Sequence, residues 1–408
     1  MKKTLIALAV LAVSGAAVAQ SSVSISGVAD MAYQMIDLKG NKINVVGANG
    51  SSTSTFILAG TEDLGGGLKA EFRWEMNPNF GETANRTAGT SAQGTTSNVT
   101  SSIGNGSSFV GASGGFGAIK LGAPNIATLS INGDGNSGFA TAVGSGYRVS
   151  SFDAVRFQNS LRYDSPTMAG FAASVVYSPK NDKQALAGSV GLSGNLNNQT
   201  NGRDDVTEIG ASYAAGPLTI RAAQLKMKQF ADVAATLDPL NGITWLNTTG
   251  AGFKLTSLSA SYKLMPTLTV AYFRQDVSSG SLVAAASDGA STPAVMQTTA
   301  RFDRTTNGLS AAFTATPTTT LRVNYQKASN GANHLAGSSA AGGSSANANK
   351  DTTVIGLGAD YALSKRTSVY ARYERNDDKA GMRAITGYTA ASGNTTYTAT
   401  AIGLRHSF

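Results

Sequence analysis

Apolar and charged side chains alternate without a break in the segment Leu68-Lys69-Ala70-Glu71-Phe72-Arg73-Trp74-Glu75-Met76. Successive side chains of a β-strand point to opposite faces, so this segment has one oily face and one fully charged face. In a soluble sandwich the charged face would meet bulk water, whereas in a transmembrane barrel it would face a watery interior. The segment therefore predicts a strand and leaves both structures open.

Similar alternation recurs along the rest of the chain, and sixteen stretches between Val23 and Phe408 show it. Clear examples of the division into apolar and polar faces lie at residues 156–163, 218–221, 321–326, 368–374 and 400–408. A tilted strand that spans a membrane needs ~9–11 residues, and the lengths of these stretches bracket that value.

The gaps between the sixteen stretches alternate in length, and this alternation favours the barrel. The long gaps are polar and rich in Gly, Ser, Asn and Thr. The short gaps are turn-like and lie at residues 63–67, 114–116, 165–170, 215–217, 264–267, 316–318 and 364–365. We therefore predict an all-β fold, a 16-stranded antiparallel transmembrane β-barrel with short periplasmic turns and long extracellular loops.

The N-terminus has the features of a secretion signal peptide over residues 1–19. Two lysines precede an apolar run at 4–13, and a small-residue cleavage site follows at 17–19. The apolar run is too short to cross ~30 Å of hydrocarbon as an anchor helix. We expect a single barrel domain over residues 20–408, exported to the cell outer membrane.

The composition argues against several other classes of protein. The chain of 408 residues has no cysteine, which excludes cysteine-based metal sites and thiol catalysis. The formal charge of +8 is mild for this length, and no dense basic run indicates a nucleic acid partner. The two histidines, His334 and His406, have no companion motif of a barrel protease or lipase. We expect no enzymatic activity, no metal and no cofactor.

Aromatic residues gather near the ends of the predicted strands. One group lies beside the short turns or at the C-terminus and comprises Tyr163, Phe171, Tyr213, Tyr262, Phe313, Tyr361 and Phe408. A second group lies near the long loops and comprises Tyr33, Trp74, Tyr177, Tyr325, Tyr373 and Tyr397. Two such bands are expected where a barrel wall meets the two membrane interfaces, because amphipathic rings find both oil and water there.

Four segments resemble those of Gram-negative general-diffusion porins, especially the β-proteobacterial branch. They are GTEDLGGGLKA at 60–70, FVGASGGFG at 109–117, LSKRTSVY at 363–370 and GLRHSF at 403–408. The resemblance implies a water-filled barrel that assembles as a homotrimer in outer-membrane lipid and lipopolysaccharide. It also implies that the third extracellular loop, residues 124–155, folds inward and narrows the pore. The terminal Phe408 implies recognition by the barrel-assembly machinery.

The sequence departs from these porins where many of them carry basic residues that help to make the constriction anion-selective. This chain has Thr55 and Ala59 along the second strand, Ser107 before the fourth and Ala123 after the fifth. The strength of any anion preference is therefore left open by the resemblance.

Charged side chains on the predicted inward faces are the candidates for lining the pore. Arginine stays charged at any relevant pH and offers a fixed fork of donors. Opposing carboxylates would complete a transverse field across the constriction. The basic candidates on the strands are Arg73, Arg156, Arg162, Arg221, Arg322, Arg372 and Arg405. The further candidates are Glu71 and Glu75 on the strand expected at residues 68–76, with Asp134, Arg148 and Asp153 in the third loop.

The function that these features favour is passive diffusion of small hydrophilic solutes and ions through an outer-membrane porin. Selectivity would combine size exclusion with a modest electrostatic preference, for anions if the arginines dominate. Two alternatives stay open. One is a substrate-selective channel for small organic anions, and the other is a non-conducting barrel that serves as an adhesin or structural anchor.

Overall fold

The computed structural model describes residues 21–38, 41–78, 106–140, 142–146, 155–179, 205–227, 236–238, 243–246, 252–279, 282–286, 298–300, 303–330, 351–378 and 395–408. The signal peptide expected at residues 1–19 lies outside this part of the chain. No helix in the described part is long and apolar enough to cross a membrane.

Seventeen strands of the described chain form one antiparallel sheet, here called the wall. They are β1 (Ser22–Leu38), β2 (Asn41–Ala48), β3 (Thr55–Gly65), β4 (Leu68–Met76), β5 (Ser108–Gly114), β6 (Gly117–Ala123), β7 (Ser160–Asp164), β8 (Phe171–Ser178), β9 (Val206–Ala215), β10 (Leu218–Met227), β13 (Phe253–Met265), β14 (Leu268–Ser279), β17 (Arg304–Thr316), β18 (Thr319–Asn330), β19 (Thr352–Ala362), β20 (Thr367–Asp378) and β21 (Thr395–Ser407).

The wall closes on itself because β1 pairs with the last strand, β21. On its other edge β1 pairs with two strands in turn, β3 over residues 22–28 and β2 over residues 31–38. Since β2 and β3 share one place beside β1, the described strands occupy sixteen positions in a closed ring. The predicted 16-stranded antiparallel barrel is therefore confirmed. The interruption between β2 and β3 was not predicted from the sequence.

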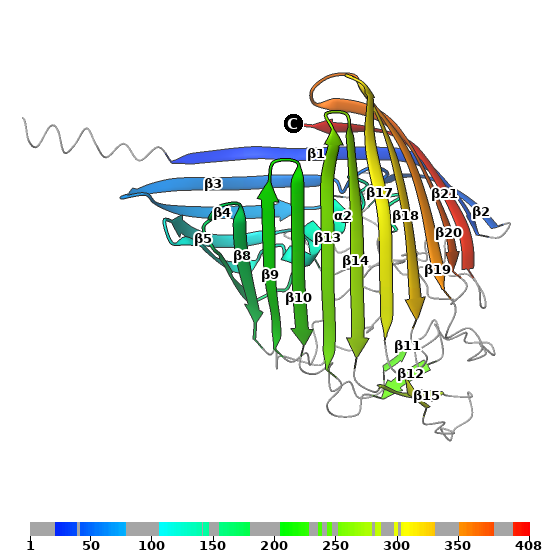
Figure 1. Ribbon diagram of the computed structural model, residues 1–408, viewed down its shortest axis with the longest axis horizontal. Helices are drawn as coiled ribbons and strands as arrows, with labels where there is room; N and C mark the ends of the chain where they lie inside the picture. The colour runs from blue at the N-terminus through cyan, green and yellow to red at the C-terminus, as the bar shows by residue number, and fades with distance from the viewer. Residues whose placement is uncertain are drawn as a thin grey trace, which may run out of the picture.

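All seven predicted short turns join neighbouring antiparallel strands at the expected places. Figure 1 shows such turns at one end of the molecule, for example between β9 and β10 and between β13 and β14. Near the opposite end lies a small sheet that the sequence did not predict. Its strands are β11 (Thr236–Asp238), β12 (Ile243–Leu246), β15 (Leu282–Ala286) and β16 (Thr298–Ala300).

The two faces of the wall have the predicted character. Large apolar side chains stay exposed on the outside, among them Leu309 and Leu357. On the inside, Gln275 and Asn324 are fully buried polar residues. The predicted position of Tyr397 in an aromatic band is wrong, because its side chain is buried inside the barrel and hydrogen-bonded to Glu374. The other aromatic residues named for the bands are not among the buried ones.

Part of the predicted third loop forms a short helix, α2 (Ala127–Gly135), which was not expected from the sequence. The helix packs against β9, β10, β13, β14 and β17. Its Ile131 is fully buried against the inward side chains Ala223 of β10 and Phe273 of β14. The loop therefore folds into the barrel, as the resemblance implied.

The outward face can be tested at Leu309, which lies near the middle of β17 and is 63% exposed. Replacing Leu309 with arginine is expected to destabilise the barrel by about 2–4 kcal/mol, because the charge would meet hydrocarbon. The measurement is the free energy of unfolding in denaturant for protein folded into liposomes. Leu309→Ala is the control, since it removes apolar surface without adding charge. An arginine variant as stable as the alanine variant would contradict a lipid-facing position.

Candidate functional site

The beginning of the third loop is held by a buried glutamate of the wall. The carboxylate of Glu208 on β9 accepts hydrogen bonds from the backbone N–H groups of Ala127 (2.6 Å) and Thr128 (3.2 Å). It also accepts one from the Thr128 hydroxyl at 2.7 Å. The first N–H groups of a helix have no partner within the helix and favour a negative charge. Glu208 therefore supplies the N-terminal cap of α2 from outside the helix.

The far end of the loop is held by a second buried glutamate, Glu374 on β20. Its Oε2 accepts hydrogen bonds from the backbone N–H groups of Gly144 (2.7 Å) and Gly146 (3.4 Å). Its Oε1 accepts one from the Tyr397 hydroxyl at 2.5 Å. On β18, the side-chain amide of Asn324 donates to the Gly144 carbonyl oxygen at 2.9 Å. This part of the loop has both its donors and its acceptors bound to the wall.

The close approach of the loop to the wall requires a glycine at position 356 of β19. A side-chain Cβ at Gly356 would lie 2.0 Å from the carbonyl oxygen of Gly144. Neighbouring wall residues complete the contact, since Gln326 donates from its amide to the Ser145 carbonyl oxygen at 2.9 Å. Any larger residue at position 356 would displace this end of the loop.

Two predicted arginines contact the middle of the loop. Arg221 on β10 forms an ion pair with Asp134 of α2, with 2.5 Å between Nε and Oδ2. Both side chains remain about one-third exposed, so the pair faces water inside the barrel. Arg322 on β18 donates from Nη1 to the Ser137 carbonyl oxygen at 2.6 Å.

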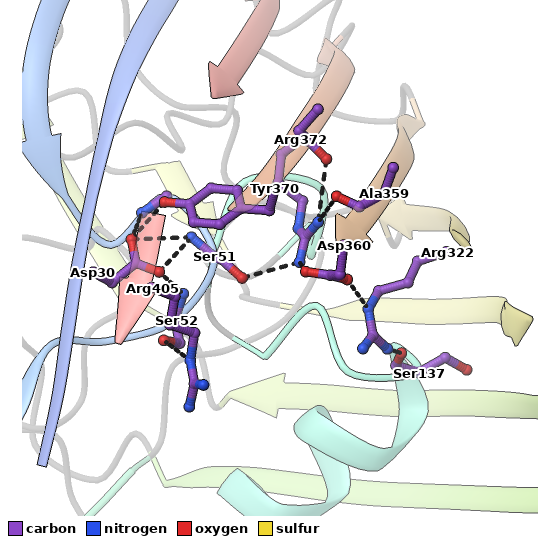
Figure 2. A network of polar contacts seen from close by, with 12 residues as sticks. Asp30, Ser51, Ser52, Ser137, Arg322, Ala359, Asp360, Tyr370, Arg372 and Arg405 are labelled. Carbon is purple, nitrogen blue, oxygen red and sulfur yellow. Dashed lines mark hydrogen bonds and ion pairs between the residues drawn. The ribbon is translucent and has the colours of Figure 1, made fainter. Parts of the chain in front are cut away.

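A polar network links arginines of three nearby strands (Figure 2). The carboxylate of Asp360 on β19 lies between Arg322 and Arg372, at 2.9 Å and 2.7 Å. The Arg372 side chain is only 1% exposed and also donates to the Ser51 hydroxyl at 2.9 Å. Arg405 on β21 donates from Nε to the Ser52 hydroxyl at 3.0 Å.

The remaining predicted arginines of the described chain also have polar partners. Arg73 pairs with Glu75 two residues along β4 at 2.6 Å. Arg162 on β7 pairs with Asp164 at 2.6 Å and donates to the backbone carbonyl oxygen of Asn125. Arg156 donates from Nε to the Asn125 side-chain oxygen at 3.2 Å. Four predicted arginines therefore lie at the third loop: Arg156, Arg162, Arg221 and Arg322.

Other predicted residues lie elsewhere. Glu71 shares the inward face of β4 with its neighbours of the same parity, whereas Arg148 and Asp153 lie outside the described residues. The backbone of Phe408 pairs with Gly27 through two hydrogen bonds of 3.1 Å, which continues the ladder between β21 and β1. Among the described residues, no three His, Cys, Asp or Glu side chains gather in a way that could hold a metal ion.

A cavity of about 100 Å³ lies between α2 and the inner face of the wall. Its polar lining comes from Ser130, Arg162, Asp164, Ser165, Ser174, Ser212 and Arg221. The cavity therefore brings two predicted arginines from separate strands to one space beside the loop.

The carboxylates that organise this site were not predicted from the sequence. Glu208, Asp360, Glu374 and Asp30 all lie on the inner face of the wall and bind loop backbone or arginine. The available signal was their inward parity along the strands, which identified the arginines and identifies acidic residues equally well.

Comparison of the sequence with known protein families agrees with this geometry. The sequence pattern of the family described as Gram-negative porin matches residues 4–381. The chain belongs to this porin family. Its location is the outer membrane, as expected from the sequence.

Curated porins of β-proteobacteria are similar over parts of the chain. Outer membrane porin protein 32 of Delftia acidovorans is 37% identical over 203 residues, which is 47% of this chain and 54% of that protein. An outer membrane porin protein of Bordetella pertussis is 34% identical over 251 residues, 54% of this chain and 58% of that protein. The chain thus spans about half the length of the curated relatives it matches.

Solved porin structures share the fold over most of the chain. An anion-selective porin from Comamonas acidovorans has a TM-score of 0.67 at 20% identity, covering 95% of this chain and 100% of that one. A trimer form of OmpT from Vibrio cholerae has a TM-score of 0.60 at 14% identity, covering 95% and 99%.

The two buried glutamates can be tested by replacing both Glu208 and Glu374 with alanine. Each change leaves two buried backbone N–H groups of the loop without an acceptor, at a cost of about 1–3 kcal/mol per group. We expect a lower unfolding temperature and protease cleavage within residues 124–155. Glu62→Ala removes an exposed carboxylate of β3 and is the control. Wild-type protease resistance in the double variant would show that the loop does not depend on these carboxylates.

Proposed function

We propose that the chain forms a water-filled channel for passive diffusion of small hydrophilic solutes and ions, with a modest preference for anions. The observation that carries this proposal is the third loop fixed inside a closed ring by Glu208 and Glu374. We expect a loop anchored there to narrow the passage, and a cavity of about 100 Å³ lies between α2 and the wall. Membership in the porin family supports the same function.

We infer that the predicted charged residues line the narrow part of this channel. Support comes from the ion pair of Arg221 and Asp134, which joins the wall to the loop in a water-exposed position. The row of Arg322, Arg372 and Arg405 adds positive charge on nearby strands. Charges fixed on low-dielectric walls focus the field on passing ions. The mechanism is passage through this field, with no covalent step and no cofactor.

We propose that the protein assembles as a homotrimer in outer-membrane lipid and lipopolysaccharide. We also propose that residues 1–19 are a signal peptide for export and that residues 20–408 form the barrel domain. The trimer form of a structural relative supports the oligomeric state. The backbone hydrogen bonds between Phe408 and Gly27 support a role for the C-terminus when the barrel-assembly machinery closes the ring.

Conductance in a planar lipid bilayer tests the channel directly. We expect stepwise ohmic current, with steps that occur in groups of three if the protein is a trimer. An absence of current at high protein load would favour the non-conducting adhesin or anchor. Current that saturates with one organic anion, and not with chloride, would favour the substrate-selective channel.

The pair of Arg221 and Asp134 predicts two opposite shifts of ion selectivity. Replacing Arg221 with serine removes a positive charge from the passage, so the reversal potential in a KCl gradient should move toward the cation value. Replacing Asp134 with asparagine removes the negative partner, so the potential should move toward the anion value. Each variant is the control for the other. Shifts of the same sign, or no shift, would contradict a position of this pair at the narrow part of the channel.

A further inference from the structure

The wall is interrupted at one place, between β2 and β3. Ala48 at the end of β2 lies opposite Met31, and Thr55 at the start of β3 lies opposite Val28. Six residues, 49–54, therefore face only two residues of β1, Ala29 and Asp30. We call these six residues the inner bulge. A β-bulge of ordinary size inserts one residue, so this insertion is unusually large.

The inner bulge folds toward the inside of the barrel. A Cβ at Gly50 would lie 2.6 Å from the Cβ of Ala32 and 2.4 Å from the hydroxyl of Tyr370. Ala32 and Tyr370 belong to one buried cluster with Ala401 on the inner face of β1, β20 and β21. The bulge thus covers part of the inner surface at the junction where the ring closes.

The carboxylate of Asp30 holds the bulge. Asp30 is fully buried and accepts hydrogen bonds from the backbone N–H groups of Gly50 (2.9 Å), Ser51 (3.2 Å) and Ser52 (3.0 Å). It accepts a fourth from the Tyr370 hydroxyl at 2.6 Å. With four donors on two oxygens, Asp30 has its acceptor capacity largely occupied.

The bulge separates two opposite charges that the strand register places together. Asp30 of β1 lies directly opposite Arg405 of β21. Opposite charges on directly facing strand positions normally interact. Here Asp30 turns to the bulge backbone, and Arg405 turns to the hydroxyl of Ser52 (Figure 2). No carboxylate of the described residues forms an ion pair with Arg405, whereas Arg322 and Arg372 share Asp360.

We propose that the inner bulge is a specificity-determining element of the channel, because it takes up the Asp30 carboxylate and so leaves Arg405 without a direct ion pair in the lumen. The inference rests on the proposed channel function. In this arrangement a serine hydroxyl, which carries no charge, fixes the direction of the guanidinium. The guanidinium of Arg405 then faces the passage with no carboxylate in contact with it, while the bulge itself reduces the open area beside β1 and β21.

The first experiment replaces residues 49–54 with two threonines, which makes one continuous strand opposite β1. Asp30 then meets Arg405 directly, so the reversal potential in a KCl gradient should shift toward the cation value. The single-channel conductance should rise because the bulge no longer occupies the lumen. Adding Asp30→Asn to this shortened chain should restore the anion preference, since Arg405 loses its new partner. A shortened chain with wild-type selectivity and conductance would overturn the proposal.

A second variant keeps the wall intact and removes only the charge. Arg405→Gln should shift the reversal potential toward the cation value, whereas Arg375→Gln, on the outward face of the neighbouring strand β20, should leave it unchanged. An unchanged potential in Arg405→Gln would overturn the proposal even if the shortened chain failed to fold. The wild-type protein is measured in the same bilayers. If the wild type itself carried no current, the channel function would fail, which is distinct from failure of the bulge variants in a conducting background.

Discussion

Every backbone N–H and C=O group of the wall needs a hydrogen-bond partner, and the architecture follows from this requirement. In a membrane, an unpaired N–H or C=O group of the wall has no water to bind, so the sheet must close into a ring. Where the chain departs from the ladder, a buried carboxylate takes over the donors. Asp30 does so at the inner bulge, Glu208 at the start of α2 and Glu374 at the end of the third loop. Three acidic side chains of the wall thus hold the two inward segments.

Most inward arginines are held in pairs, which changes what they contribute to the interior. Arg73, Arg162 and Arg322 each have a carboxylate within 3 Å. A close pair has little net charge at a distance, although it keeps both side chains in a defined direction. The balance of charge in the lumen therefore depends on the positions where pairing is incomplete, and Arg405 is such a position among the described residues.

Local alternation was enough to predict the wall, because the parity of each strand decides which side chains meet water. Strand β4 has the alternation of apolar and charged side chains that the sequence indicated. The seven short turns lie where such alternating segments end. The inward elements could not be predicted in the same way. Residues 127–135 have almost no amphipathic pattern, and α2 depends on Glu208, which lies far along the chain. The inner bulge likewise depends on Asp30 and Tyr370, which are distant in sequence. The inward position of Tyr397 follows from its strand parity, which it shares with the buried Ala399 and Ala401, although it lies near a long loop.

Pairing of β1 with β21 has a consequence for how the protein is made. Contacts between the two ends of a chain form late, because the entropy of closing so large a loop must be overcome first. Until β21 pairs with it, β1 has an open edge that could recruit a strand from another molecule. The exported chain must therefore be kept apart from other copies until its first and last strands pair.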